Sequence, residues 1–339
     1  MNQDIAEKYK QALALINQSS NVLITGHTRP DGDSCGSVGA ISKMLISMGK
    51  NVVPFMITPC SDDFMFLAEG LNYLIADEKQ DIAMQINSRC KDIDLVIIVD
   101  TNSRNQLPRF ERWLDQAGCK VVVFDHHITA DGLGDVEIVD TSAAAAGQVV
   151  CNFMEAMNIE ITPDIANLLF TAIAADTGWF RFGNRNKGNV YEMAGRLIDK
   201  GAVPTDIFEK LFQQMSEGKL KLLARAIDSM QLQLSGQVAT QVLLLSDFAA
   251  TGTRGRDTGG IVQEPHKIIG VDTSVIFIEQ PEGGFKCSMR SKGKVNVREI
   301  AQKYDGGGHD FAAGATINMP LDELKSLIIG EIEAQIIHG

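Results

Sequence analysis

The stretch Val123-Phe124-Asp125-His126-His127 places a carboxylate and two adjacent imidazoles at the end of an apolar run that is typical of a buried strand. Burying such groups beside valines costs free energy unless they pair with each other or bind a metal ion. Three other segments carry Asp or His where a strand or a helix ends. Because open α/β sheets hold their ligands at the carboxyl ends of their strands, this recurrence predicts side chains that converge on metal ions at one sheet edge.

The first half of the chain alternates strand and helix patterns. We expect strands at residues 21–26, 52–57, 95–100 and 120–125. We expect helices at residues 34–48, 62–67, 82–90, 109–117, 142–157 and 163–176. The strands are runs of Val and Ile without alternation, which indicates burial on both faces of a parallel sheet. The sequence therefore predicts an α/β fold whose N-terminal domain has a doubly wound, mainly parallel sheet.

The second half has a helical stretch over about residues 190–230, followed by a new series of strands. These strands are expected at residues 237–245, 271–279, 285–290 and 312–317, before a last helix at 321–337. A chain of 339 residues exceeds the size that one hydrophobic core usually supports. We therefore expect three parts, with the active-site cleft between the first and the last: a metal-binding catalytic domain over residues 1–186, a helical connector over 187–230, and a smaller α/β domain with a mixed sheet over 231–339.

Composition narrows the class of protein. The chain is 45% hydrophobic, and its apolar runs are shorter than the roughly 20 residues that a membrane helix needs. Its N-terminus lacks the layout of a signal peptide, and its six cysteines show no C-x-x-C pair, so we expect a cytoplasmic protein with reduced thiols. A net charge of −12 argues against a protein that coats long nucleic acid, but carboxylates that bind cations would contribute to such a charge.

The loop after the first expected strand contains His27, Asp31 and Asp33. Two carboxylates separated by Gly32 can point at two different cations, one of which His27 can also reach. Carboxylate and imidazole together suit a hard or borderline divalent metal. The alternative is an Asp-Gly turn in which Asp33 or Ser34 caps the following helix.

Two further acids stand at the ends of apolar elements. Asp100 follows Val96-Ile97-Ile98-Val99, at the carboxyl edge of the sheet, although a terminal Asp can also simply cap a turn. Asp176 closes an apolar helix, where the negative end of the helix dipole disfavours an unpaired acid. A cation near Asp176 would offset that cost. The alternative interpretation is that water solvates Asp176 at an exposed helix end.

Together these four segments resemble, in order and spacing, the motif set of the DHH phosphoesterase superfamily over nearly the whole chain. The resemblance implies two divalent cations, with Mn²⁺ expected and Mg²⁺ as the alternative. One would be held by His27, Asp31 and Asp100, and the other by Asp33, Asp100, His126 and Asp176, so that Asp100 bridges them. It also implies that His127 contacts the phosphate or transfers a proton. Such a cation pair can turn water into a nucleophile for in-line attack on phosphorus.

The C-terminal half contains Gly306-Gly307-Gly308-His309, preceded in the chain by Arg290. Consecutive glycines expose backbone N–H groups that can hold an anion, and a His or Arg adds charge-assisted hydrogen bonds. Taken alone, the glycines are more typical of a flexible turn. The segment resembles the signature of the DHH-associated C-terminal domain, which implies that Arg290, Gly307, Gly308 and His309 bind substrate.

Within that superfamily, the chain is most similar to the nanoRNase and pAp phosphatase group. The resemblance implies hydrolysis of short oligoribonucleotides to mononucleotides, of 3′-phosphoadenosine 5′-phosphate (pAp) to AMP, or of both. It also implies short oligonucleotides or phosphorylated nucleotides as partners, no long duplex and no membrane, and a homodimer. The runner-up is a phosphodiesterase for cyclic or linear dinucleotides such as cyclic di-AMP and pApA. Polyphosphate or pyrophosphate hydrolysis and a non-catalytic nucleotide-binding regulator rank lower.

Overall fold

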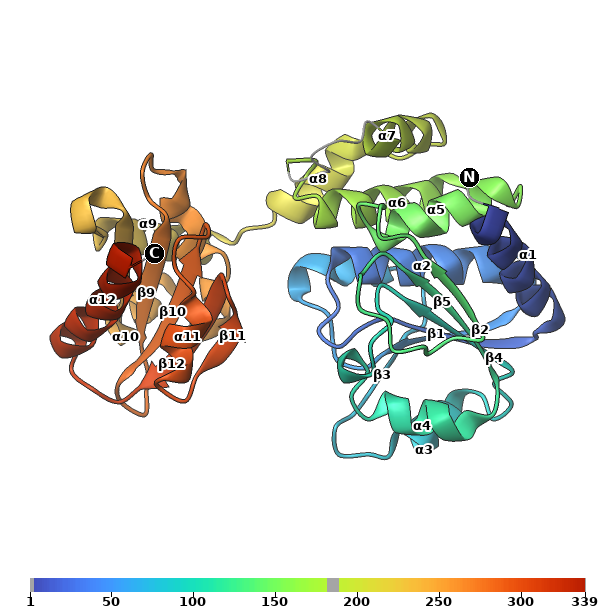
Figure 1. Cartoon of the computed structure of the whole chain (residues 1–339), viewed down its shortest axis with the longest axis horizontal. Coiled ribbons are helices and arrows are strands. Elements are labelled where there is room, and N and C mark those ends of the chain that lie inside the picture. The colour runs from blue at the N-terminus through green and yellow to red at the C-terminus, as the bar shows by residue number, and fades with distance from the viewer. Residues whose placement is uncertain (1–2, 182–188, 339) are drawn as a thin grey trace. The chain divides into compact units, whose positions relative to one another are not determined.

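The computed structural model describes residues 3–181 and 189–338. The chain divides into two compact units, residues 1–214 and 215–339, each with its own sheet (Figure 1). The predicted domain boundary between residues 186 and 187 lies outside the described residues, so the limits 1–186, 187–230 and 231–339 stay a prediction. Within the described ranges, no helix combines the length and the apolar character that crossing a bilayer requires.

The sheet of the first unit consists of six parallel strands in the order β3-β2-β1-β4-β5-β6. The strands are β1 (Asn21–Thr25), β2 (Asn51–Met56), β3 (Leu74–Ile75), β4 (Leu95–Val99), β5 (Lys120–Asp125) and β6 (Val136–Val139). All five residues of the central strand β4 are buried, which explains its unbroken apolar sequence. The prediction of a doubly wound parallel sheet is confirmed. The edge strands β3 and β6 were not predicted, because one is only two residues long and the other four.

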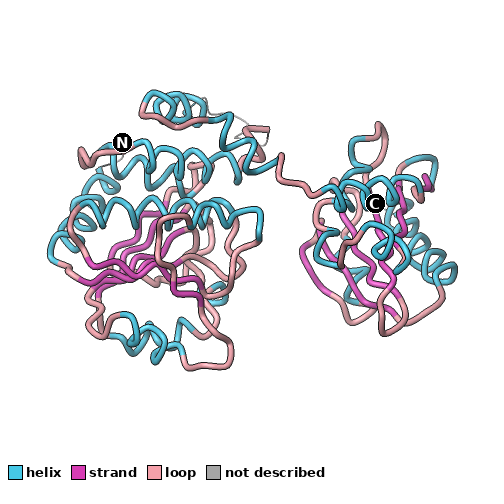
Figure 2. The backbone as a smooth tube through the Cα atoms, turned by 180° about the vertical axis from the view of Figure 1, so that it is seen from behind, coloured by secondary structure: helices cyan, strands magenta, loops and turns pink. Residues whose placement is uncertain are grey.

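Helices cover both faces of this sheet (Figures 1 and 2). One face packs on α1 (Gln3–Gln18), α2 (Gly32–Ser47), α5 (Ala146–Ala156) and α6 (Pro163–Asp176). The other packs on α3 (Ile82–Arg89) and α4 (Phe110–Ala117). Alternate residues of one strand enter different cores: Ile97 and Val99 face the first helical layer, and Val96 and Ile98 the second. The helix expected at residues 62–67 is the 3₁₀ helix η1 (Asp62–Ala68), and the loop after β4 contains the 3₁₀ turn η2 (Arg104–Gln106).

Helix α2 lies unusually close to α6 because glycines form its contact face. A Cβ atom built on Gly36 would lie 2.6 Å from the carbonyl oxygen of Leu168, and one on Gly32 would lie 2.4 Å from the Cβ atom of Ala175. Any side chain at these positions would push the helices apart. The close contact brings the N-terminus of α2 and the C-terminus of α6 to the same edge of the sheet.

Three helices lie between the two sheets in the sequence, and each of them packs on one unit. In α7 (Asn189–Asp199) and α8 (Pro204–Phe212), buried apolar side chains such as Val190 and Ile207 belong to the core of the first unit. In α9 (Glu217–Asp228), Leu222 and Ala226 belong to a core of the second unit. The stretch predicted as a helical connector therefore consists of helices that are parts of the two units.

The sheet of the second unit is mixed, as predicted, and has six strands in the order β11-β12-β10-β9-β8-β7, of which β7 and β11 were not predicted. Strands β8 and β9 are parallel, and the other neighbours are antiparallel. The strands are β7 (Gln231–Gln233), β8 (Val238–Leu243), β9 (Thr273–Glu279), β10 (Phe285–Ser291), β11 (Gly307–His309) and β12 (Ala312–Ile317). One face packs on α11 (Val297–Gln302) and α12 (Leu321–His338). The other packs on α9, α10 (Leu245–Thr251) and η5 (Ile261–Lys267), and the short turns η3 (Leu234–Gly236) and η4 (Gly255–Thr258) complete the unit.

The contact between α2 and α6 predicts opposite effects for two Gly→Ala changes in helices. In α7, Gly195→Ala meets nothing within 4 Å, so the better helix propensity of Ala should raise the free energy of unfolding by up to about 1 kcal/mol. Gly36→Ala should instead lower it by about 1–3 kcal/mol, because the backbone of α6 must move. Urea denaturation of the two variants tests this, and a stabilised Gly36→Ala protein would contradict the close packing.

Candidate functional site

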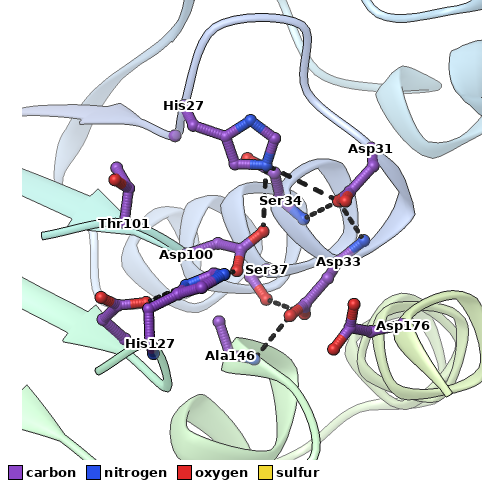
Figure 3. Close-up of polar contacts among 12 residues, drawn as sticks. His27, Asp31, Asp33, Ser34, Ser37, Asp100, Thr101, His127, Ala146 and Asp176 are labelled. Atoms are coloured by element: carbon purple, nitrogen blue, oxygen red, sulfur yellow. Dashed lines mark hydrogen bonds and ion pairs between the residues drawn. The ribbon is translucent and has the colours of Figure 1, made fainter. Parts of the chain in front are cut away.

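The first unit brings together every residue that the sequence suggested as a metal ligand. Figure 3 labels all of them except His126. His27 follows β1, Asp100 follows β4, and His126 follows β5, so all three stand at the carboxyl edge of the sheet. The two close-packed helices add the remaining carboxylates: Asp31 and Asp33 come from the start of α2 and Asp176 from the end of α6. The convergence of strand ends therefore follows from the parallel topology, and that of the helix ends from the contact between α2 and α6.

Asp100 lies at the centre of this group and is 3% exposed. Its Oδ2 atom lies 3.2 Å from Nε2 of His27, and its Oδ1 atom lies 3.5 Å from Nε2 of His126 and 3.8 Å from Nδ1 of His127. Burial alone would raise the pKa of Asp100, but the hydrogen bonds and charges of His126 and His27 hold it below its usual value. The backbone of Asp100 has a positive φ of 60°, an uncommon conformation for a residue other than glycine.

The His27 side chain is fixed from two sides. Its Nδ1 atom lies 2.8 Å from the carbonyl oxygen of Thr28, which favours a proton on Nδ1 and directs Nε2 toward the carboxylates. Nε2 also lies 3.8 Å from Oδ1 of Asp31. Burial would lower the pKa of His27, but hydrogen bonds to Asp100 and Asp31 raise it to about 11. The Nε2 atom of His27 thus lies where the carboxylates attract a positive charge, whether a proton or a metal ion.

The sequence left open whether the carboxylates of this loop cap the following helix or bind a metal ion, and Asp31 and Asp33 differ in this respect. Asp31 is the N-cap of α2, since its Oδ1 atom accepts hydrogen bonds from the backbone N–H groups of Asp33 and Ser34. The capping alternative had assigned this role to Asp33 or Ser34. Asp33 is instead buried, and its carboxylate accepts hydrogen bonds from the backbone N–H groups of Ala146, at 2.6 Å, and Gly147, at 2.8 Å. Capping and metal binding are therefore compatible in this loop.

The start of α5 holds Asp33 in a fixed position beside two other acids. Its Oδ2 atom lies 3.8 Å from Nε2 of His126. Burial, followed by the charges of Asp100 and Asp176, raises the pKa of Asp33 well above its usual value. A cation close to Asp33 would oppose all three of these effects.

Asp176 is the fourth carboxylate. Its Oδ2 atom lies 3.7 Å from Nε2 of His126. Its pKa is raised to about 6, first by burial, with His126 acting in the opposite direction and Asp100 and Asp31 adding to the rise. The unfavourable position at the end of α6, which the sequence indicated, is therefore present in the structure.

Asp125 takes a role that the sequence did not assign. It is fully buried, and its Oδ1 atom accepts hydrogen bonds from the backbone N–H groups of His126, at 2.8 Å, and His127, at 3.2 Å. The same atom lies 2.8 Å from Nδ1 of His127, and this contact, partly opposed by burial, raises the pKa of His127. Asp125 therefore orients the imidazole of His127 and holds the backbone at His126. Its place directly before them in the chain was the only signal for this.

The donor set fits divalent cations. Three groups have ligand atoms that lie within 4.8 Å of one another: His27 with Asp31 and Asp100, Asp33 with His126 and Asp176, and Asp100 with His126 and His127. A pocket of about 330 Å³ opens onto the site, and no Lys or Arg is among the described residues that line it. Four carboxylates with only imidazoles as basic partners among the described residues favour binding of metal ions, and imidazole with carboxylate suits divalent ones.

The same pocket has a wall that sequence reasoning missed. Its residues are uncharged and polar, and most lie in the loop after β4: Thr101, Asn102, Ser103, Asn105, Gln106 and Thr129. Their position directly after Asp100 was the available signal. Such side chains are so common in loops that the sequence alone did not distinguish a pocket wall from an ordinary turn.

In the second unit, the expected substrate-binding residues lie along one row of the sheet. Ala312 of β12 pairs with Arg290 on one side and with His309 on the other. Gly308, with φ of 143°, allows β11 to approach β12, since a Cβ atom there would lie 2.3 Å from the carbonyl oxygen of Ala312. Arg290 is half-buried, burial lowers its pKa, and its guanidinium donates to the carbonyl oxygen of Met289. These residues therefore stand side by side on the sheet, and their role in substrate binding and the interdomain cleft stay predictions.

Comparison with protein families identifies the class. Residues 21–173 match the DHH family, N-terminal domain, and residues 235–336 match the DHHA1 domain. The chain therefore carries a DHH domain followed by a DHHA1 domain, as the resemblance in sequence had indicated.

Individual relatives extend the match over nearly the whole chain. The probable bifunctional oligoribonuclease and PAP phosphatase NrnA of Streptococcus mutans is 28% identical over 91% of this chain and 93% of its own. The bifunctional oligoribonuclease and PAP phosphatase NrnA of Thermus thermophilus is 26% identical over 93% and 90%.

Solved structures confirm the fold. An exopolyphosphatase-related protein from Bacteroides fragilis superimposes with a TM-score of 0.84 and 22% identity, over 97% of this chain and 96% of that one. RecJ of Thermus thermophilus, solved in complex with Mn²⁺, gives a TM-score of 0.55 with 13% identity over 99% of this chain and 55% of that one. These likenesses concern the fold alone.

The raised pKa of Asp176 predicts a pH-dependent effect of Asp176→Asn. Because the pKa rises from 3.8 in the unfolded chain to about 6 in the folded one, the metal-free protein loses stability as pH increases through this range. The variant avoids this loss. In EDTA it should melt at a higher temperature than the parent protein at pH 7.5, and the difference should shrink toward pH 4.

Thermal melts across this pH range, with and without Mn²⁺, measure the effect. Glu160→Gln, which changes an exposed carboxylate of the same unit, is the control and should leave the melting temperature unchanged. Addition of Mn²⁺ at pH 7.5 should stabilise the parent more than Asp176→Asn. A variant that is less stable than the parent protein in EDTA at pH 7.5 would contradict the destabilisation attributed to the ionised Asp176 carboxylate.

Proposed function

We propose that this chain is a phosphoesterase that depends on divalent cations and hydrolyses short oligoribonucleotides to mononucleotides and pAp to AMP. The observation that carries the proposal is the convergence of His27, His126 and four carboxylates at one edge of the sheet, where a pocket opens. Relatives named as oligoribonuclease and PAP phosphatase, which match over nine tenths of both chains, support the choice of substrates. A homodimer and a cytoplasmic location stay predictions from the sequence.

Two cation positions follow from the ligand groups. His27, Asp31 and Asp100 would hold one ion, and Asp33, Asp100, His126 and Asp176 the other, with Asp100 contributing to both. A mixed set of imidazole and carboxylate ligands suits Mn²⁺, and Mg²⁺ is the alternative. When bound, such ions lower the pKa of a water molecule and offset charge on phosphoryl oxygens.

The side chains around these positions have their own tasks. Asp125 holds Nδ1 of His127, so the Nε2 atom of that ring is free to exchange a proton with a phosphate ester oxygen. His127 lines the pocket and is about half exposed, with a side-chain exposure of 53%, which lets it reach a substrate. The fully bonded carboxylate of Asp33 keeps its orientation without help from the substrate.

The second unit would recognise the terminal phosphate of the substrate. Arg290 and His309 offer charge-assisted hydrogen bonds, and Gly307 and Gly308 leave the backbone open to an anion. Within the described part of the chain, the half-buried guanidinium of Arg290 pairs with no carboxylate. A site that holds a chain end favours short substrates over long duplexes.

A substrate panel with Mn²⁺ tests the function directly. RNAs of two to five nucleotides and pAp should be hydrolysed faster than pApA, cyclic di-AMP, polyphosphate or a long duplex. Asp100→Asn should lower turnover by about 10³-fold or more and weaken Mn²⁺ binding, because one carboxylate serves both ions. Asp199→Asn, an exposed acid on α7, is the control. Turnover of the cyclic dinucleotide alone would favour the phosphodiesterase alternative, and full activity of Asp100→Asn would refute the shared ligand.

His309→Ala should separate substrate binding from metal binding. We expect KM for pAp to rise about tenfold, since a charge-assisted hydrogen bond is lost, with a smaller change in kcat. Mn²⁺ binding, measured by equilibrium titration, should match that of the parent protein. Equal loss of Mn²⁺ affinity and of turnover would instead make His309 a metal ligand.

A further inference from the structure

The pocket of the first unit has two chemically different halves. One consists of acids and imidazoles: His27, Asp31, Asp100, His127 and Asp176. The other is the uncharged wall defined above, of residues 101–103, 105, 106 and 129. The proposed cation positions explain the first half and leave the second without a role.

The uncharged wall is built rigidly. Asp131 accepts hydrogen bonds from the Ser103 hydroxyl, at 2.9 Å, and from the Arg104 backbone N–H, at 2.7 Å, and its own N–H donates to the carbonyl oxygen of Asn102. The carbonyl oxygen of Gln106 accepts a hydrogen bond of 2.8 Å from the N–H of Thr28, beside His27. The wall is therefore tied both to the loop after β5 and to the loop that carries a proposed ligand. Rigid placement is typical of groups that recognise a ligand by shape.

Among the described residues, the wall offers no positively charged side chain to a phosphate. Of the two arginines in the loop between β4 and α4, Arg104 makes two hydrogen bonds of 2.9 and 3.0 Å to the carboxylate of Asp115, and Arg109 donates to the carbonyl oxygens of Asp77 and Gln80. Neither of them lines the pocket. Uncharged hydroxyl and amide groups instead match the hydroxyls of a sugar and the polar edge of a base.

One amide in this wall has an unused donor. Asn102 is 1% exposed and its Oδ1 atom accepts a hydrogen bond from the N–H of Leu133, yet its Nδ2 atom is buried without a partner. A buried donor without an acceptor costs on the order of 1–3 kcal/mol. Such a group calls for an explanation, which can be a functional role or a bound water molecule or ion. Asn102 thus gives this wall one unsatisfied donor that does not depend on the acids.

We propose that the uncharged wall binds the sugar and base of the nucleoside that carries the reacting phosphate, with exposed Asn105 and Gln106 as the contacting side chains. This inference rests on the proposed function and adds to it a subsite for one nucleoside. A pocket of about 330 Å³ lies at the small end of ligand sites, which suits a single nucleotide unit and not two.

The experiment compares ligands with and without a nucleoside. AMP and inorganic phosphate are titrated into the Mn²⁺-loaded protein, and kcat/KM is measured for a diribonucleotide and for bis(p-nitrophenyl) phosphate. The variant is Asn105→Ala with Gln106→Ala, both at exposed positions, and its melting temperature verifies folding. Gln11→Ala, an exposed glutamine on α1, is the matched control.

In the double variant, the preference for AMP over phosphate should fall about tenfold, since two hydrogen bonds are lost. The ratio of the two kcat/KM values should fall similarly, and Gln11→Ala should retain both ratios. A variant that keeps the parent's preference for AMP, or a parent protein that binds AMP no better than phosphate, would overturn the subsite. A parent protein that prefers AMP and cleaves bis(p-nitrophenyl) phosphate but no oligonucleotide would instead refute the proposed function.

Discussion

The candidate site depends on the buried carboxylate of Asp100. Its two oxygens face imidazoles from two different loops, at 3.2 Å for His27 and 3.5 Å for His126. A buried charge without such partners would cost several kcal/mol. The left-handed backbone of Asp100 turns the chain sharply at the end of β4, which keeps this side chain at the sheet edge. The loops after β1, β4 and β5 are therefore placed by one shared electrostatic requirement.

Helix packing brings two of the other three carboxylates, Asp33 and Asp176, to the site. Asp33 is 113 residues from Ala146 in sequence, yet the N–H groups at the start of α5 bind its carboxylate directly. The positive end of a helix dipole stabilises a carboxylate there. Asp176 has the opposite environment, at the C-terminal end of α6. The pKa values of both acids are nevertheless raised, in each case first by burial. Both acids reach the site because Gly32 and Gly36 let α2 and α6 approach each other.

Much of this arrangement could be predicted from the sequence, for physical reasons. Strands such as β4 are buried on both faces and therefore appear as unbroken apolar runs, which makes their polar ends conspicuous. The short edge strands β3 and β11 leave no such pattern. The cap formed by Asp31 and the orientation of His127 by Asp125 could not be predicted, because both depend on side-chain directions that spacing alone does not encode. The uncharged wall was missed for a similar reason: Ser, Thr and Asn have the same appearance in a binding loop and in a solvated one.

Charge links the two halves of the pocket. An anionic substrate approaching four carboxylates is repelled, and no Lys or Arg among the described lining residues offsets this repulsion. The net charge of −12 acts in the same direction. Among the described residues that line this pocket, only imidazoles could attract a phosphate without metal, so affinity for substrate should rise when cations bind, even before chemistry begins. Hydrogen bonds from the proposed uncharged subsite to a sugar or a base would add to this affinity, because they do not depend on the sign of the local field.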